Sequence, residues 1–309
     1  MPQPLACEET QTHEGDSPME IEIEDKSLMM IFLLEECNFS CPHCVREDEP
    51  LDPGYKLSFR QLQLCLSDCH RLESVRWVHF SGGEPTLWTE GNWDLMDLLL
   101  EISKHNFIPG FTTNGSAFLD YDDCHDFIGR YIDGSTIPLR LYLSIDTFHG
   151  NFDAKTGRAQ SLDNVTRCQR ELPSDKGDLI DTRVLTVISK DFKSLLPDEM
   201  ITHYESLGVT FAFIPLKLMG RAKMVSNLCP DLKSDSPEDL GAYRRFHRNK
   251  RFKQPEKIGN RDKASHIVLI DDNYYVHVDN CHNFRDRWHK VSKLGNLPDT
   301  IIHAYSFRP

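Results

Sequence analysis

Cys37, Cys41 and Cys44 stand close together, with three and then two residues between them. Thiolates are the preferred ligands of iron–sulfur clusters and of zinc. A closed structural site takes four protein ligands, whereas three thiolates leave one coordination position for chemistry. The spacing therefore predicts a metal centre and leaves iron and zinc open. In the zinc alternative His43 or His70 completes the site, and in the remaining interpretation the three thiols are unrelated.

The segment before this triplet is a short apolar run, residues 28–34, which favours a buried parallel strand. Strand-like and helix-like segments alternate after it. Further strands are predicted at residues 75–80, 107–113, 139–145, 182–188 and 209–214, and helices at residues 62–72, 93–102, 122–131, 162–172 and 195–207. Such repeats predict an α/β protein with a parallel sheet, whose site lies at the carboxyl ends of the strands.

The two ends of the chain differ from this middle part. Residues 1–26 carry eight carboxylates and few large apolar side chains, which predicts a disordered acidic tail. Residues 266–270 and 274–278 are two β-rich runs around a turn, and they predict a hairpin. We therefore expect a catalytic unit over residues 27–223 and a C-terminal extension over residues 224–309 that covers the substrate.

Composition narrows the classes of function. The net charge of −13 argues against broad nucleic-acid binding, because phosphate neutralisation requires a cationic face. No window approaches the roughly 20 apolar residues of a membrane helix, and the N-terminus lacks the pattern of a secretory signal. We expect a soluble, cytoplasmic protein whose ten cysteines are thiols or metal ligands rather than a disulfide framework.

Polar motifs follow three more of the predicted strands. They are Ser-Gly-Gly-Glu-Pro at residues 81–85, Thr-Thr-Asn-Gly at residues 112–115 and Ser-Ile-Asp at residues 144–146. The two glycines allow a close backbone approach to a ligand, and the carboxylate beside them can accept hydrogen bonds from an ammonium group. The structural alternatives are an ordinary Gly-Gly turn and a strand-end Asp that caps the next helix.

The triplet and these motifs, in this order, closely resemble the radical S-adenosylmethionine (SAM) superfamily, whose signature is C-x-x-x-C-x-x-C after the first barrel strand. The resemblance implies a partial (β/α)6 TIM-like barrel with a small C-terminal β-hairpin and α extension. It implies that Cys37, Cys41 and Cys44 bind a [4Fe–4S] cluster, whose fourth iron binds SAM. The residues that it implies at the SAM site are His43, Gly82, Gly83, Glu84, Thr113, Asn114, Ser144, Asp146 and Ile214.

The resemblance also implies roles for these residues and an activity. Glu84 holds the amino group of SAM, Ser144 and Asp146 contact its carboxylate and ribose, and His43 packs near the adenine. The implied reaction is reductive cleavage of SAM to a 5′-deoxyadenosyl radical, which removes a hydrogen atom from a substrate. The implied partners are that substrate and a reductant such as flavodoxin or ferredoxin.

The C-terminal segment resembles a degenerate SPASM or Twitch extension, with too few cysteines for a two-cluster set. In size and layout the chain is similar to compact radical SAM epimerases that act on aminoglycosides, which implies Cys281 as a hydrogen-atom donor. A buried structural thiol is the alternative for Cys281. His149 and Asp153, after the fourth predicted strand, are expected near the mouth of the barrel and could contact substrate.

We therefore expect a small-molecule substrate, such as a sugar, aminoglycoside or nucleotide-like compound, that is epimerised or dehydrogenated. A peptide-modifying enzyme is the alternative within the superfamily, and the short N-terminal tail disfavours it. A zinc-binding adaptor protein that uses the same triplet is the alternative of another class.

Overall fold

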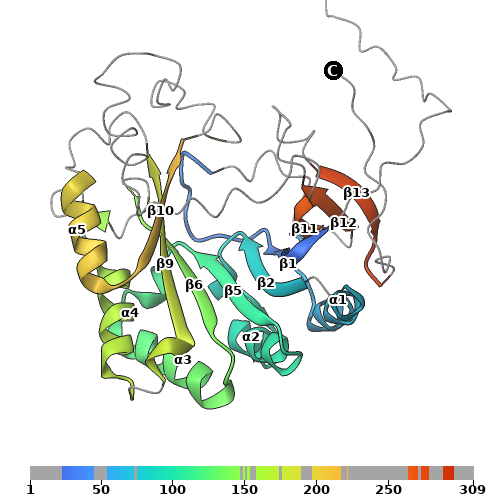
Figure 1. The fold of residues 1–309 in the computed structure, drawn as a ribbon, viewed down its shortest axis with the longest axis horizontal. Coiled ribbons are helices and arrows are strands. Elements are labelled where there is room, and N and C mark those ends of the chain that lie inside the picture. The colour runs from blue at the N-terminus through green and yellow to red at the C-terminus, as the bar shows by residue number, and fades with distance from the viewer. Residues whose placement is uncertain are drawn as a thin grey trace, which may run out of the picture.

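The structure is a computed structural model, and it describes residues 23–44, 54–72, 75–146, 149, 152–153, 158–173, 176–188, 197–216, 221, 264–270, 273–277 and 288–295. Its main feature is one sheet of nine strands in the order β10-β9-β6-β5-β2-β1-β11-β12-β13 (Figure 1). The strands are β1 (Ile23–Leu34), β2 (Val75–Gly82), β5 (Ile108–Thr113), β6 (Leu139–Ser144), β9 (Ile180–Ile188), β10 (Thr210–Pro215), β11 (Ala264–Ile270), β12 (Asn273–His277) and β13 (Trp288–Lys293).

The six strands from β1 to β10 pair in parallel, and helices connect them. The helices are α1 (Phe59–Arg71), α2 (Leu95–Lys104), α3 (Tyr121–Gly134), α4 (Gln160–Glu171) and α5 (Pro197–Leu207). They lie along one face of the curved sheet (Figure 1). This arrangement confirms the predicted α/β fold and is consistent with a partial TIM-like barrel. No described helix is long and apolar enough to cross a membrane.

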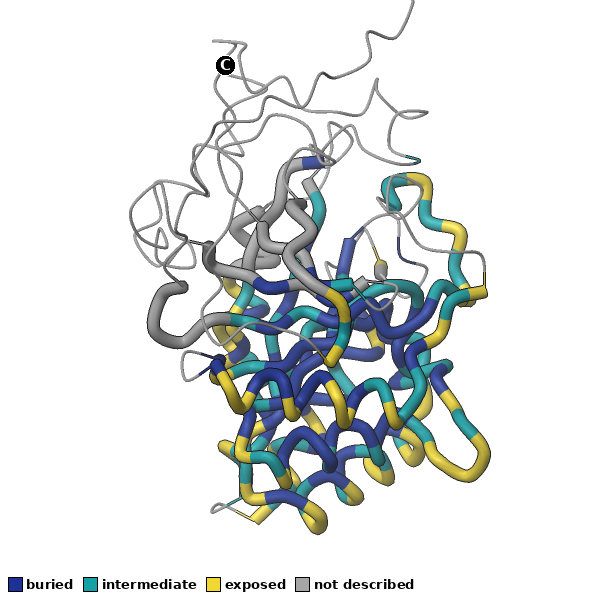
Figure 2. The backbone as a smooth tube through the Cα atoms, turned by 90° about the vertical axis from the view of Figure 1, so that its right-hand side faces the viewer, coloured by how far each residue is buried: buried dark blue, intermediate teal, exposed yellow. Residues whose placement is uncertain are grey.

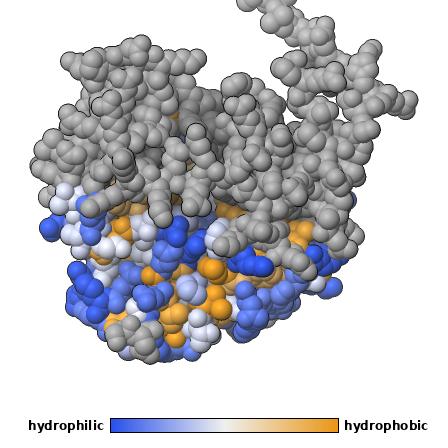
Figure 3. All heavy atoms as spheres, in the orientation of Figure 1, coloured by the Kyte–Doolittle hydropathy of each residue, from blue (hydrophilic) through white to orange (hydrophobic). Residues whose placement is uncertain are grey.

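Alternate residues of the strands form the core between the sheet and these helices. Phe80, Phe111, Leu141 and Val184 are fully buried there, one on each of four neighbouring strands. Figure 2 shows this layer as a continuous buried region under the more exposed outer helix turns, whereas Figure 3 shows polar and apolar residues mixed on the described surface. The intervening strand residues, which are more polar, face the other side of the sheet.

Helix starts follow the local signals in the sequence. Ser58 caps α1: its hydroxyl accepts from the backbone N–H of Gln61, whose side chain accepts from the backbone N–H of Ser58. Asp94 caps α2 in the same reciprocal way with Asp97. Each cap satisfies backbone donors that have no partner inside the helix. The helix that we expected to begin at Trp93 therefore begins two residues later.

The C-terminal hairpin is part of the main sheet. β11 pairs with β1 in parallel, and β12 and β13 follow in antiparallel order. The buried carboxylate of Asp68 on α1 ties this edge to the barrel: its Oδ2 accepts from the hydroxyl of Tyr274 and from the backbone N–H of Gly295, each at 2.8 Å. Ile267, Leu269 and Tyr274 thus belong to the same buried core as the parallel strands.

Two further features of the sheet differ from the expectations. β1 begins at Ile23, so residues 23–26 are strand rather than part of the expected tail, the rest of which lies outside the described residues. Backbone pairing, which needs no apolar side chains, accounts for this, since Ile23 pairs with Ala264 of β11. β13 was not expected, because its sequence, Trp-His-Lys-Val-Ser-Lys, is too polar to stand out as a strand.

Candidate active site

The cysteine triplet lies in the loop that follows β1, at the carboxyl edge of the parallel strands. Cys37, Cys41 and Cys44 form no disulfide and are half-buried rather than enclosed in the core. The backbone N–H of Phe39 donates to Sγ of Cys37 at 3.4 Å, and the amide of Asn114 donates to the same sulfur at 3.9 Å. Donors directed at a sulfur stabilise its thiolate form.

Gly82 and Gly83 bring the end of β2 against the end of β1. A Cβ at Gly83 would lie 1.9 Å from the carbonyl oxygen of Glu36, and one at Gly82 would lie 2.7 Å from that of Leu34. Gly82 also has a φ of +111°, which side chains disfavour. The close approach that these glycines permit is therefore to the backbone that leads into the cysteine loop.

The carboxylate of Glu84 is buried and joins two strand ends. Its Oε1 accepts from the hydroxyls of Thr86 and Thr113, each at 2.7 Å, and its Oε2 accepts from the backbone N–H of Asn114 at 2.8 Å. The side chain of Asn114 donates in turn to Oδ1 of Asn38 at 2.8 Å. Glu84, Thr113 and Asn114 thus form one network that reaches the cysteine loop.

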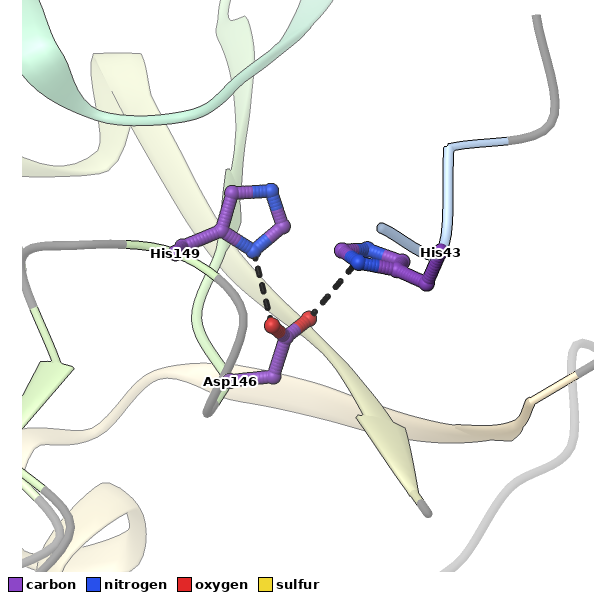
Figure 4. A group of neighbouring side chains, drawn as sticks. All are labelled: His43, Asp146 and His149. Atoms are coloured by element: carbon purple, nitrogen blue, oxygen red, sulfur yellow. Dashed lines mark hydrogen bonds and ion pairs between the residues drawn. The ribbon is translucent and has the colours of Figure 1, made fainter. Parts of the chain in front are cut away.

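A second group of side chains lies where β6 ends. The carboxylate of Asp146 is fully buried, with Oδ1 at 2.9 Å from Nδ1 of His149 and Oδ2 at 3.8 Å from Nε2 of His43 (Figure 4). The rings of His43 and His149 meet edge to face at 5.0 Å. His43 belongs to the cysteine loop, so Asp146 and His149 both contact this loop through His43.

The two histidines differ in charge preference. Burial lowers the pKa of His43 to about 4, an effect that the nearby Asp146 carboxylate only partly offsets. Burial also acts to lower the pKa of His149, but the hydrogen bonds to Asp146 and Cys41 outweigh it and raise that pKa to about 10. At neutral pH, His149 is therefore a cation beside the carboxylate of Asp146, whereas His43 is neutral.

The other expected site residues are placed as follows. Ser144 ends β6 and is half-buried on the sheet face opposite the helices. Ile214 lies in β10, paired with Val187. After β10 the backbone N–H of Arg221 donates to the carbonyl of Cys44 at 2.9 Å, so this loop also contacts the triplet. Cys281 lies outside the described residues.

His70 cannot complete a zinc site with the triplet. It lies in the last turn of α1, where its Nε2 is 2.9 Å from Nδ1 of His105 and its ring packs on Phe107. Phe107 directly precedes β5, so His70 is at the amino ends of the strands, whereas the triplet follows the carboxyl end of β1. Of the two histidines that we considered as a fourth ligand, only His43 is near.

The donor set fits a [4Fe–4S] cluster and SAM. Three thiols on one loop, outside any disulfide, suit cluster ligation, and Cys37 already accepts two hydrogen bonds. The edge around them presents amide, hydroxyl and carboxylate groups, which suit the polar groups of SAM.

Two contributions were not anticipated from the sequence. Asn38, inside the triplet, links Asn114 and Ser116. His149 was expected near the mouth of the barrel, and the structure adds its contact with Asp146, in which Nδ1 lies 2.9 Å from Oδ1. The signal for His149 was its place three residues after Asp146, which a turn brings into contact; nothing in the sequence marked Asn38.

Comparison with known proteins agrees with this arrangement. Residues 31–178 match the family model of the radical SAM superfamily. The matched segment contains the triplet, the Glu84 network and Asp146. These 148 of the 309 residues are therefore similar to the radical SAM domain. The cofactors that characterise this superfamily are a [4Fe–4S] cluster and SAM.

Two curated proteins are similar to parts of the chain. A tungsten-containing aldehyde ferredoxin oxidoreductase cofactor-modifying protein of Pyrococcus furiosus is 30% identical over 92 residues, which are 28% of this chain and 24% of that protein. The molybdenum cofactor biosynthesis protein moc-5 of Caenorhabditis elegans is 27% identical over 165 residues, 52% of this chain and 26% of that protein. The matched segments thus span about a quarter of either relative.

The fold is similar to that of a solved structure, native anSMEcpe with bound AdoMet. The TM-score is 0.52 and the identity 16%, with 87% of this chain and 78% of that chain covered. At this identity the likeness is one of fold.

Proposed function

We propose that the chain binds a [4Fe–4S] cluster through Cys37, Cys41 and Cys44, binds SAM beside it, and removes a hydrogen atom from a small polar molecule. The observation that carries this proposal is the convergence of the cysteine loop with the Glu84 network and Asp146 at one edge of the sheet. When bound, the cluster and SAM together supply a carbon-centred radical.

The residues of this edge would each have a separate task. The three thiolates hold the cluster and leave one iron open. Asp146, fixed by His149, accepts hydrogen bonds from hydroxyl groups of SAM, with Ser144 nearby. Glu84 already accepts hydrogen bonds from four donors of the chain, Thr86 N–H and hydroxyl, Thr113 hydroxyl and Asn114 N–H. Three of these bonds go to Oε1 and one to Oε2, so the carboxylate holds the Thr113–Asn114 turn in position and Oε2 can also accept from the amino group of SAM.

The small-molecule assignment rests on the sheet face opposite the helices. Between Ser144 and the amino end of β6 this face carries Arg140 and Tyr142, with His79 and Arg183 on strands nearby. Such closely spaced hydrogen-bonding side chains suit a compact polar compound, for example a sugar, an aminoglycoside or a nucleotide-like molecule. Epimerisation and dehydrogenation both begin with the same hydrogen abstraction.

A peptide substrate is the alternative. A solved structure of native anSMEcpe with bound AdoMet and a peptide has a TM-score of 0.51 with this chain, at 16% identity. This likeness concerns the fold, whereas the polar face belongs to this chain's own sequence, and we therefore retain the small molecule.

We further propose that residues 27–223 are the catalytic unit and that residues 224–309 cover the substrate. The contact of Asp68 with Tyr274 and Gly295 supports an extension that is fixed on the barrel. A reductant such as flavodoxin or ferredoxin would deliver the electron.

The proposal is tested with anaerobically reconstituted protein, reduced and incubated with SAM. The expected product is 5′-deoxyadenosine, which gains deuterium when a deuterated substrate is added. A colourless protein that retains zinc and forms no 5′-deoxyadenosine would favour the adaptor alternative. Deuterium transfer from a labelled peptide, and from no small molecule, would favour the peptide alternative.

A further inference from the structure

The sheet face opposite the described helices carries a row of charged and polar side chains. Arg140 and Tyr142 face the same side of β6 as Ser144, because alternate strand residues share a face. Arg140 pairs in register with Asp181 of β9, and Tyr142 pairs with Arg183. Two guanidinium groups and one carboxylate thus lie side by side on this face.

A glycine makes room for Arg140. Gly110 of β5 lies between Arg140 of β6 and His79 of β2. A Cβ at Gly110 would lie 2.8 Å from Nδ1 of His79 and 3.1 Å from Cβ of Arg140. Because Gly110 has no side chain, the guanidinium carbon of Arg140 reaches across β5 and lies 4.2 Å from the ring centre of Trp77. This stacking fixes the plane of the guanidinium group.

The hydrogen bonds to Asp181 come mainly from the other arginine, Arg183. Arg183 donates to Oδ2 of Asp181 through Nη2 at 2.7 Å and Nε at 3.0 Å, and through Nη1 to the hydroxyl of Tyr142 at 3.3 Å. Arg140 reaches the same oxygen only with Nε, at 3.5 Å. Its Nη groups make no hydrogen bond with any residue that the structure describes, although the side chain is only 22% exposed.

The two positive charges of Arg140 and Arg183 are therefore balanced by only one carboxylate on this face, that of Asp181. Burial, followed by repulsion from Arg183, lowers the pKa of Arg140 below its usual value, which is the expected response of a cation whose charge is not fully paired. A second anion beside Arg140 would remove this penalty. A planar fork of N–H donors on an aromatic ring is suited to a bidentate oxyanion.

We propose that this face is a binding site for an oxyanion of the substrate, a carboxylate or a phosphate, held by the Nη groups of Arg140 with Arg183 beside it. The proposal deepens the function above and rests on it for the identification of the ligand as substrate. With a rise of about 3.3 Å per residue, Arg140 lies about 13 Å along β6 from Ser144. A substrate anchored at Arg140 would place its far end near the carboxyl edge, where the cofactors bind.

Anion binding is tested directly with the full-length native protein. Its thermal unfolding is followed in inorganic phosphate and in acetate, against sodium chloride at equal ionic strength. Either anion should raise the unfolding temperature with a saturable dose dependence. Stabilisation by phosphate points to a phosphorylated substrate, and stabilisation by acetate points to a carboxylate. If neither anion stabilises the native protein more than chloride does, the proposal is wrong.

Variants locate the site. Arg140→Gln should raise the apparent Kd of the stabilising anion about tenfold, because it removes the charge and the fork. Arg60→Gln is the matched control, since Arg60 is an exposed arginine on the outside of α1, and its Kd should equal that of the native protein. Equal Kd values for Arg140→Gln and the native protein would overturn the proposal. Should Arg140→Gln fail to fold, Arg140→Met, which also removes the charge, replaces it, and an unchanged Kd there would have the same meaning.

The result does not depend on the proposed radical chemistry, because anion binding is measured without SAM or turnover. Formation of 5′-deoxyadenosine by the native protein is measured separately. A native protein that binds the anion at Arg140 and cleaves no SAM would refute the proposed function and leave the anion site standing. A native protein that cleaves SAM and binds neither anion would refute only the site.

Discussion

Oδ1 of Asp146 lies 2.9 Å from Nδ1 of His149, whose ring meets the ring of His43 edge to face at 5.0 Å. These contacts connect the end of β6 with the loop after β1, although two strands, β5 and β2, lie between β6 and β1 in the sheet. Because Asp146 is fully buried, its position is set by these contacts and not by solvent. The contacts couple the residue expected to contact SAM to the loop expected to hold the cluster.

The first prediction concerns Asp146. Asp146→Asn keeps the size of the side chain but removes its charge, so we expect the affinity for SAM to fall about tenfold, as for loss of a charge-assisted hydrogen bond. Equilibrium binding of SAM to the reconstituted protein measures this, together with the iron content, which should not change. Asp126→Asn, at an exposed position on α3, is the control. Unaltered SAM affinity in Asp146→Asn would show that Asp146 does not contact the cofactor.

The second prediction concerns Gly83. In Gly83→Ala the new Cβ would overlap the carbonyl of Glu36, so the backbone must shift at the entrance to the cysteine loop. We expect the protein to bind less than half of the native amount of iron. Gly129→Ala on α3 is the control, because no atom lies within 4 Å of its Cβ position, and alanine favours a helix. Native iron content in both variants would contradict the role of this close approach.

The third prediction concerns Asp68, which contacts the C-terminal strands from α1. Asp68→Ala leaves the hydroxyl of Tyr274 and the N–H of Gly295 without their acceptor. Loss of buried hydrogen bonds of this kind costs about 2 kcal/mol of unfolding free energy. Denaturant unfolding measures the loss, and Asp126→Ala should cost much less. Stability equal to the native protein would mean that the extension is not held at this point.

The sequence predicted the parallel strands well because each is an apolar or alternating run between polar turns. Tertiary pairing explains the failures. The charged start of β1 and the polar β13 are strands because they pair along the sheet edge, and a backbone hydrogen bond is independent of side-chain type. The joining of β11 to β1 is likewise a long-range contact that no local pattern encodes.

The site was predicted as a set of motifs, but not as a network. Cys37, Glu84 and Asn114 were each identified, whereas the structure adds that Asn114 bonds both Cys37 and the carboxylate of Glu84. The roles of Arg140 and Arg183 were missed because an arginine in a strand has no motif. Their significance comes from Gly110 and Asp181 on neighbouring strands, which only the register reveals.

The most direct measurement of the central claim is the iron content and electron paramagnetic resonance spectrum of the anaerobically reconstituted and reduced protein. We predict four irons per chain and the signal of a reduced [4Fe–4S] cluster, which changes when SAM is added. Serine at position 37, 41 or 44 should abolish both, whereas Cys168→Ala, at a buried free thiol on α4, should retain them. A native protein without a four-iron cluster, or a cluster that survives any of the three serine substitutions, would contradict the account.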